Sequence, residues 1–117
     1  MFRCITKLKG LAVDIDSFHL DDNTIWIDIN NLVPCIFITA KKDTKDWLSV
    51  IFGSEKVIMR EKVIEMETYE KVFAPNKSTH AKVLNTLNIQ NTELAYLSHS
   101  HEFLKNANGF LCGSIWI

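Results

Sequence analysis

Residues 11–16 read LAVDID, an apolar stretch that ends in two aspartates two positions apart, and this stretch decides the fold. A short apolar run of this kind predicts a buried strand. Side chains alternate along a strand, so Asp14 and Asp16 should lie on the same side of the sheet where the strand ends. Because charged groups are costly to bury unless they are paired or bind a metal ion, the two acids predict either a functional site or an ordinary solvated turn.

The composition is typical of one globular domain. The chain has 117 residues, of which 47% are hydrophobic and 23% are charged, and its formal net charge is −1. That length supports one hydrophobic core, and the absence of a long basic block argues against binding to nucleic acid. No stretch approaches the length of a membrane span, and the first ten residues lack the apolar run of a signal peptide. We therefore expect a cytoplasmic protein that binds neither nucleic acid nor membrane.

Strand and helix patterns alternate along most of the chain. Residues 24–29, TIWIDI, alternate from one residue to the next, which predicts the second arm of a hairpin. Further strands are predicted at 35–39, 56–59, 94–97 and 110–117, and helices at 43–52, from 78 onward and at 101–107. This order predicts an α/β fold, a Rossmann-like three-layer sandwich with a mainly parallel sheet and a β-hairpin flap after the first strand.

Ligands of such sheets bind beyond the carboxyl ends of the strands. Polar side chains follow several of the predicted strands at this edge. These candidates are Asp14 and Asp16, then Thr39, then Met59 and Arg60, and finally Ser98, His99 and Ser100. Their convergence on one edge indicates a site more strongly than any one of them does.

Taken in order, the segments resemble the haloacid dehalogenase-like superfamily of phosphatases and phosphotransferases, and the resemblance covers residues 10–117. The family's first motif is an apolar strand that ends in Asp-x-Asp, which VDID at residues 13–16 matches. By this resemblance Asp14 is the nucleophile that accepts a phosphoryl group, and Asp16 is a general acid and base. The implied reaction is hydrolysis of a phosphomonoester through an aspartyl-phosphate intermediate.

Two further motifs of the family have counterparts in this chain. The second motif is an apolar strand that ends in Thr or Ser, which FIT at residues 37–39 matches, and the third is a lysine near the start of a later helix, which Lys77 matches. The resemblance implies that Thr39 and Lys77 bind the phosphate. A carboxylate can attack phosphorus only when the phosphate charge is masked, and a lysine, hydroxyl groups and Mg²⁺ provide that masking.

The fourth motif departs from the family pattern. Family members have Gly-Asp after an apolar strand and then a further acid, and these acids bind Mg²⁺. Here residues 98–103 read SHSHEF, so His99 stands at the first acid position and Phe103 where the second often falls. Histidine is a poor ligand for the hard Mg²⁺ ion. The magnesium ligands that remain as candidates are Asp14, Asp16 and Glu102.

The resemblance also implies a single haloacid dehalogenase-like domain over residues 1–117, with no cap domain between Asp16 and Ala40. Two functions follow from it. The first is a Mg²⁺-dependent phosphomonoester hydrolase of reduced activity, acting on a small phosphorylated substrate. The second is a catalytically inactive domain that acts as an interaction or regulatory module, for example as a homo-oligomer through the hairpin at residues 18–29, where Trp26 should be exposed.

The remaining candidate residues have structural interpretations. His80 should face solvent from its helix, and Trp47 and Trp116 should belong to the core. Cys35 and Cys112 lie in apolar segments and are expected to be buried, reduced thiols. His99 and His101 stand two positions apart in a loop, which would suit a transition metal only if a third ligand joined them.

Overall fold

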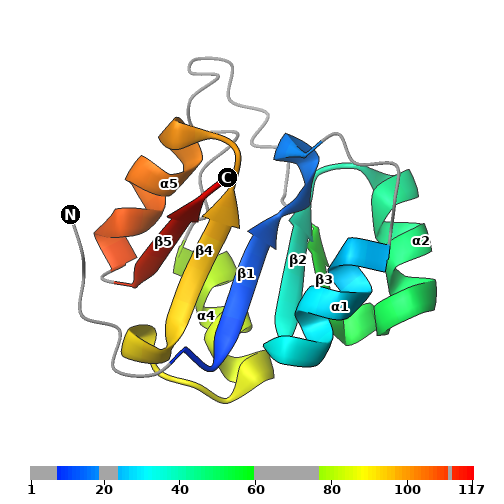
Figure 1. The fold of residues 1–117 in the computed structure, drawn as a ribbon, viewed down its shortest axis with the longest axis horizontal. Helices are drawn as coiled ribbons and strands as arrows, with labels where there is room; N and C mark the ends of the chain where they lie inside the picture. The colour runs from blue at the N-terminus through cyan, green and yellow to red at the C-terminus, as the bar shows by residue number, and fades with distance from the viewer. Residues whose placement is uncertain (1–7, 19–23, 60–76, 111) are drawn as a thin grey trace.

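The computed structural model describes residues 8–18, 24–59, 77–110 and 112–117. The described residues form one five-stranded sheet in the order β3-β2-β1-β4-β5, with every neighbouring pair parallel (Figure 1). The strands are β1 (Gly10–Asp14), β2 (Cys35–Thr39), β3 (Val57–Met59), β4 (Leu94–Ser98) and β5 (Gly113–Trp116). The helices are α1 (Thr24–Leu32), α2 (Lys42–Phe52), α4 (Lys77–Leu87) and α5 (His101–Ala107). The predicted α/β sandwich is confirmed, and no cap domain is evident among the described residues.

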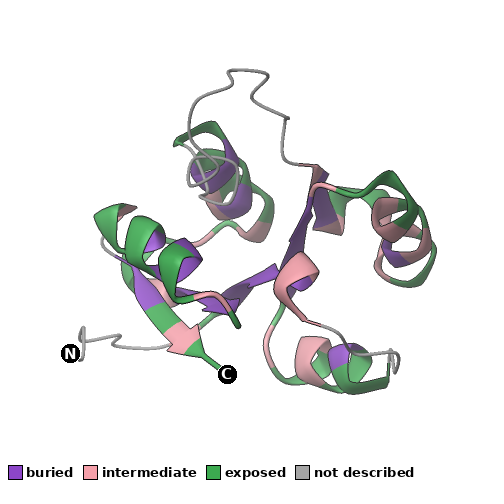
Figure 2. Ribbon diagram, turned by 90° about the horizontal axis from the view of Figure 1, so that it is seen from above, coloured by how far each residue is buried: buried purple, intermediate pink, exposed green. Residues whose placement is uncertain are grey.

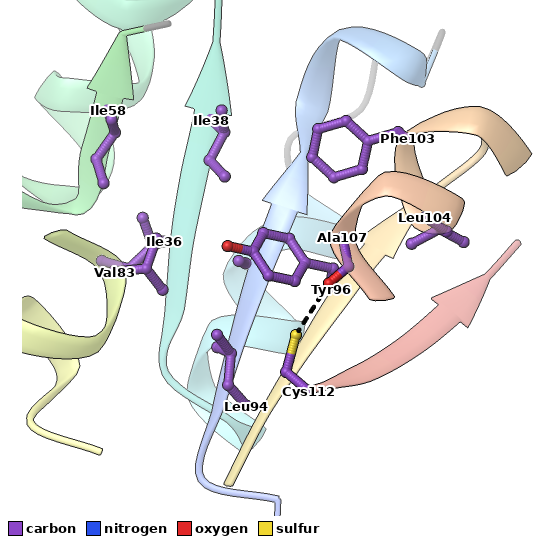
Figure 3. Close-up of a cluster of buried hydrophobic side chains, with 11 residues drawn as sticks. Ile36, Ile38, Ile58, Val83, Leu94, Tyr96, Phe103, Leu104, Ala107 and Cys112 are labelled. Carbon is purple, nitrogen blue, oxygen red and sulfur yellow. Dashed lines mark hydrogen bonds between the residues drawn. The ribbon is translucent and has the colours of Figure 1, made fainter. Parts of the chain in front are cut away.

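Helices cover both faces of the sheet, which makes three layers (Figures 1 and 2). On one face, side chains of α4 and α5 pack on Ala12, Ile36 and Tyr96, a cluster that Figure 3 shows. On the other face, Trp26 of α1 and Leu48 of α2 pack on the alternate residues of the same strands. The strands β1, β2 and β4 are buried along their whole length, as continuous apolar runs in a parallel sheet should be.

The expected hairpin flap is wrong, because residues 24–29 form the first turns of α1. The alternation of TIWIDI suits a strand, but β1 and β2 pair in parallel, and a connection between parallel strands crosses the sheet, usually through a helix. Trp26 is 2% exposed and packs edge to face on Phe37 and on Phe18, which follows the short 3₁₀ helix at Ile15–Ser17. Trp26, which was expected on a contact surface, is therefore part of the core. Residues 19–23 of the predicted hairpin lie outside the described residues.

The end of α2 is as predicted. Gly53 has a φ of 98°, and its N–H donates to the carbonyl of Ser49, so a residue without a side chain ends the helix in a conformation that other residues rarely adopt. The segment 60–73, for which the sequence favours neither helix nor strand, lies outside the described residues. No helix in the described part of the chain is long and apolar enough to cross a bilayer.

Two side chains lie where the sequence did not predict them. His80 is 7% exposed: its Nδ1 lies 2.9 Å from the hydroxyl of Tyr96, its Nε2 lies 2.6 Å from Oδ1 of Asn91, and its ring stacks on Phe110. Trp116, expected in the core, is 54% exposed at the end of β5. Cys35 and Cys112 are buried, as predicted.

Candidate functional site

The carboxyl ends of β1, β2 and β4 bring three polar side chains to one edge of the sheet. Asp14 ends β1, Thr39 ends β2 and Ser98 ends β4, and the parallel register keeps these ends level. Beyond β1 the chain turns through a short 3₁₀ helix, η1 (Ile15–Ser17), which carries Asp16. The predicted convergence at this edge is confirmed for Asp14, Thr39 and Ser98, while Arg60 lies outside the described residues.

Asp14 is held toward β4. Its side chain is 3% exposed, and the hydroxyl of Ser98 donates to its Oδ2 over 2.9 Å. The other carboxylate oxygen, Oδ1, is buried as well. A carboxylate that is almost fully removed from water needs hydrogen-bond donors from the protein, and the Ser98 hydroxyl is one of them.

Asp16 is held toward β2, on the opposite side of β1. The hydroxyl of Thr39 donates to its Oδ1 over 2.6 Å, and the backbone N–H of Ala40 donates to its Oδ2 over 2.8 Å. The N–H of Lys41 in turn donates to the Thr39 hydroxyl. Because β1 ends at Asp14, strand alternation does not extend to Asp16, and the two carboxylates take different neighbouring strands as partners.

Ser17 joins the loops that follow β1 and β4. Its hydroxyl donates to the backbone carbonyl of Asp14 over 2.8 Å and accepts from the N–H of His99 over 2.9 Å. Ser17 was not among the candidate residues predicted from the sequence. Its structural role depends on His99, which lies more than eighty positions away, so no local sequence pattern could have revealed it.

The loop after β4 is held by hydrogen bonds among its own residues and by contacts with the C-terminal residues. The N–H of Ser100 donates to the Ser98 hydroxyl, and the Ser100 hydroxyl caps α5 by accepting from the N–H of Phe103. The imidazole Nδ1 of His99 contacts the backbone carbonyl of Ile117, and the ring lies parallel to Trp116. The His99 side chain therefore bonds to Ile117, the residue that follows β5.

Lys77 and Glu102 were expected to complete the site. Lys77 is an exposed residue at the start of α4, and Glu102 is an exposed residue in the first turn of α5. Both side chains lie at the molecular surface. The structure thus groups Asp14, Asp16, Thr39 and Ser98, and it places Lys77 and Glu102 on the surface.

Hydrogen bonds within the protein compete for the carboxylate oxygens of the magnesium site that the resemblance implies. Mg²⁺ binds carboxylate, phosphate and water oxygens in strict octahedral geometry. Both oxygens of Asp16 already accept hydrogen bonds, and Oδ2 of Asp14 accepts one from Ser98. Among the residues that the structure describes, no group of three or more His, Cys, Asp or Glu side chains could hold a metal ion.

The buried Cys35 does not add a nucleophile to the site. Burial raises the pKa of the Cys35 thiol to about 12, and the nearby charge of Lys56 lowers it only in part. A thiol with this pKa stays protonated near neutral pH and is a poor nucleophile. The site is therefore a set of carboxylates and hydroxyls.

Comparisons with family models, curated proteins and solved structures give no significant match to this chain. The resemblance to the haloacid dehalogenase-like superfamily accordingly remains a hypothesis that rests on the quoted motifs, and the fold and the hydrogen-bonded edge of the sheet are what the structure adds to it.

Proposed function

We propose that this chain is a haloacid dehalogenase-like domain that does not carry out magnesium-dependent phosphoryl transfer and that acts as an interaction or regulatory module. The observation that carries the proposal is the end of β4, where Ser98 bonds to Asp14 and His99 bonds to Ile117. Members of the family that the chain resembles have an acid that binds a metal ion at the position of His99. The chain uses the position for internal hydrogen bonds.

The chemistry of the reaction supports this proposal. A carboxylate nucleophile must reach the phosphorus atom, and the charge of the phosphate must be masked while it does so. Both oxygens of Asp14 are shielded, since one accepts from Ser98 and the other is buried. The Thr39 hydroxyl, which would bind phosphate, is engaged with Asp16. Turnover would require these internal bonds to break first.

Exposed apolar side chains on α1 and α2 support a role in protein contacts. Leu32 on α1 is 83% exposed and Val50 on α2 is 87% exposed, and Ile25 and Ile51 on the same two helices are also exposed. Single exposed apolar residues are common, but several on adjacent elements of one face are typical of interaction surfaces. We propose that the chain self-associates through the exposed apolar residues of α1 and α2, and not through the hairpin that was expected from the sequence.

Two measurements test the proposal. In a phosphatase assay with p-nitrophenyl phosphate and 10 mM MgCl₂, the parent chain should release no more phosphate than the Asp14→Asn variant. Sedimentation equilibrium should show self-association that Leu32→Ser and Val50→Ser weaken, whereas Asn31→Ser, an exposed polar residue on α1, leaves it unchanged. Phosphate release that Asp14→Asn abolishes would reject the first half of the proposal, and a strictly monomeric parent would reject the second.

A weak phosphohydrolase is the second candidate. The observation that favours it is the juxtaposition of Asp14, Asp16 and Thr39 at the carboxyl edge of the sheet, the place where such sheets bind ligands. In this case Asp14 would be the nucleophile and Asp16 would exchange a proton with the leaving group. Activity that depends on both aspartates in the same assay would establish this candidate instead.

A further inference from the structure

Asn108 and Gly109 form an exposed turn at the end of α5. The chain has four glycines, and Gly109 is the one that follows an asparagine. Asn108 is the C-terminal cap of α5, and the short 3₁₀ helix η4 (Asn108–Phe110) leads from there toward β5 (Figure 1). Gly113, the first residue of β5, pairs near the start of β4. The turn and the site at Asp14 therefore lie at opposite edges of the sheet.

The backbone nitrogen of Gly109 is free to approach the side chain of Asn108. Both residues are exposed, and a Cβ built at Gly109 would meet no described atom within 4 Å apart from its neighbours in the chain. Glycine has no side chain to shield its nitrogen, and its backbone rotates more readily than that of other residues. Two reacting groups held next to each other in one chain have a high effective concentration. The turn thus places a nucleophile, the Gly109 nitrogen, beside an electrophile, the Cγ of Asn108.

Ser114 supplies a hydrogen-bond donor at the carbonyl of this electrophile. Its hydroxyl donates to Oδ1 of Asn108 over 2.7 Å. Oδ1 gains negative charge when a nucleophile adds to Cγ, and a donor that is already in place stabilises this charge. Ser114 lies on β5, so its hydroxyl reaches Asn108 only when β5 is folded against the end of α5.

We propose that Asn108 is a site of intramolecular deamidation, which the Ser114 hydroxyl promotes. The nitrogen of Gly109 forms a bond to Cγ of Asn108 and loses its proton, the bond between Cγ and Nδ2 breaks, and ammonia leaves with that proton. The product is a five-membered succinimide. Water then opens the ring at one of its two carbonyls and gives aspartate or isoaspartate. The net reaction consumes one water molecule and releases one molecule of ammonia.

The modification changes the connection between α5 and β5. A carboxylate replaces a neutral amide at the C-terminal end of a helix, where the backbone carbonyls already carry partial negative charge. Isoaspartate also adds one carbon atom to the backbone. Phe103, Leu104 and Ala107 on α5 belong to the core, so aged protein should melt at a lower temperature than fresh protein. The proposal is independent of the proposed function, because it involves neither the carboxyl edge of the sheet nor the exposed apolar residues of α1 and α2.

The test follows the chain during incubation at pH 8 and 37 °C for four weeks, with mass spectrometry of tryptic peptides. Peptide 106–117 should gain about 1 Da, located at Asn108 and not at Asn106 by fragmentation, and an isoaspartyl methyltransferase should label it. Asn85, an exposed asparagine in α4 that precedes a β-branched residue, is the internal control and should stay unchanged. Gly109→Ala places its Cβ in open space and should slow the conversion roughly tenfold, because the side chain shields the nitrogen.

Variants at Ser114 test the donor. Ser114→Ala should slow the conversion of Asn108 roughly threefold or more, and Ser114→Thr, which keeps a hydroxyl, should convert at the parent rate. In 6 M guanidinium chloride the parent and Ser114→Ala should convert equally fast, because the contact exists only in the folded chain. Asn108 that converts no faster than Asn85 would overturn the site. A folded Ser114→Ala variant that converts as fast as the parent, or faster, would overturn the role of Ser114.

Discussion

The hydroxyl of Thr39 donates a 2.6 Å hydrogen bond to Oδ1 of Asp16, and this contact joins the end of β2 to the turn that follows β1. The same carboxylate accepts the N–H of Ala40 through its other oxygen. One acidic side chain thereby holds together two loops that lie at the carboxyl edge of the sheet. The contact gives Asp16 and Thr39 a structural role that requires no ligand.

Thr39→Val should destabilise the fold. The substitution keeps the shape of the side chain and removes the donor to Asp16, and a hydrogen bond to a charged group contributes about 1.5–3 kcal/mol. Urea unfolding at neutral pH measures the change. Thr92→Val alters an exposed threonine and should leave the free energy of unfolding within about 0.5 kcal/mol of the parent. Equal stabilities of the two variants would show that the Thr39–Asp16 contact contributes nothing.

Trp26→Ala should be among the most damaging single substitutions in the chain. Trp26 is 2% exposed and packs on Phe18 and Phe37, and truncation of a buried tryptophan costs about 3–5 kcal/mol. Trp116→Ala, at a side chain that is 54% exposed, should cost much less. Differential scanning calorimetry of both variants checks the order. Were Trp26→Ala the milder change, α1 would not be packed as described.

Tyr96→Phe should weaken the fold through His80. Oδ1 of Asn91 only accepts, so Nε2 of His80 carries the proton, and Nδ1 accepts from the Tyr96 hydroxyl. Loss of that donor leaves a buried nitrogen without its partner at a cost of about 1–3 kcal/mol. A double-mutant cycle with His80→Phe measures the coupling between the two residues in urea unfolding. Additive effects would argue that the pair does not interact.

Alkaline pH should destabilise the protein through Cys35. Burial raises the pKa of this thiol from 9.0 to about 12, so between these two pH values the folded state keeps the proton while the unfolded state loses it. The stabilisation is fully present below pH 9 and is lost as the pH rises toward 12. Chemical unfolding at pH 8 and pH 10 should show a fall in stability that is smaller in Cys35→Ala. An identical fall in both proteins would assign the effect to other groups.

The three central strands could be predicted from their own residues. GLAVD, CIFIT and LAYLS are short apolar runs, and each is buried throughout because both faces of a parallel sheet are covered. The polar residues at their ends then follow from topology, since parallel strands present their carboxyl ends at one edge. This is why Asp14, Thr39 and Ser98 could be grouped before the structure was known.

The segment TIWIDI could not be assigned in the same way. Its residues suit a strand, and a short alternating segment is compatible with either period. The parallel pairing of β1 with β2 required a crossover, and the contacts of Trp26 with Phe18 and Phe37 supplied the burial that stabilises α1. His80 escaped prediction for a related reason, because its partners Tyr96 and Asn91 are distant in sequence.

The sequence by itself determined the parallel α/β architecture and the edge at which the polar residues gather, because apolar runs and their order are local properties of the chain. Only the tertiary structure decided what those residues do. The partners of Asp14 and Asp16 come from different strands, and the Ser98 and Thr39 hydroxyls reach them only after the sheet has formed. A hydrogen bond depends on distance and direction in space, and spacing along the chain does not fix either.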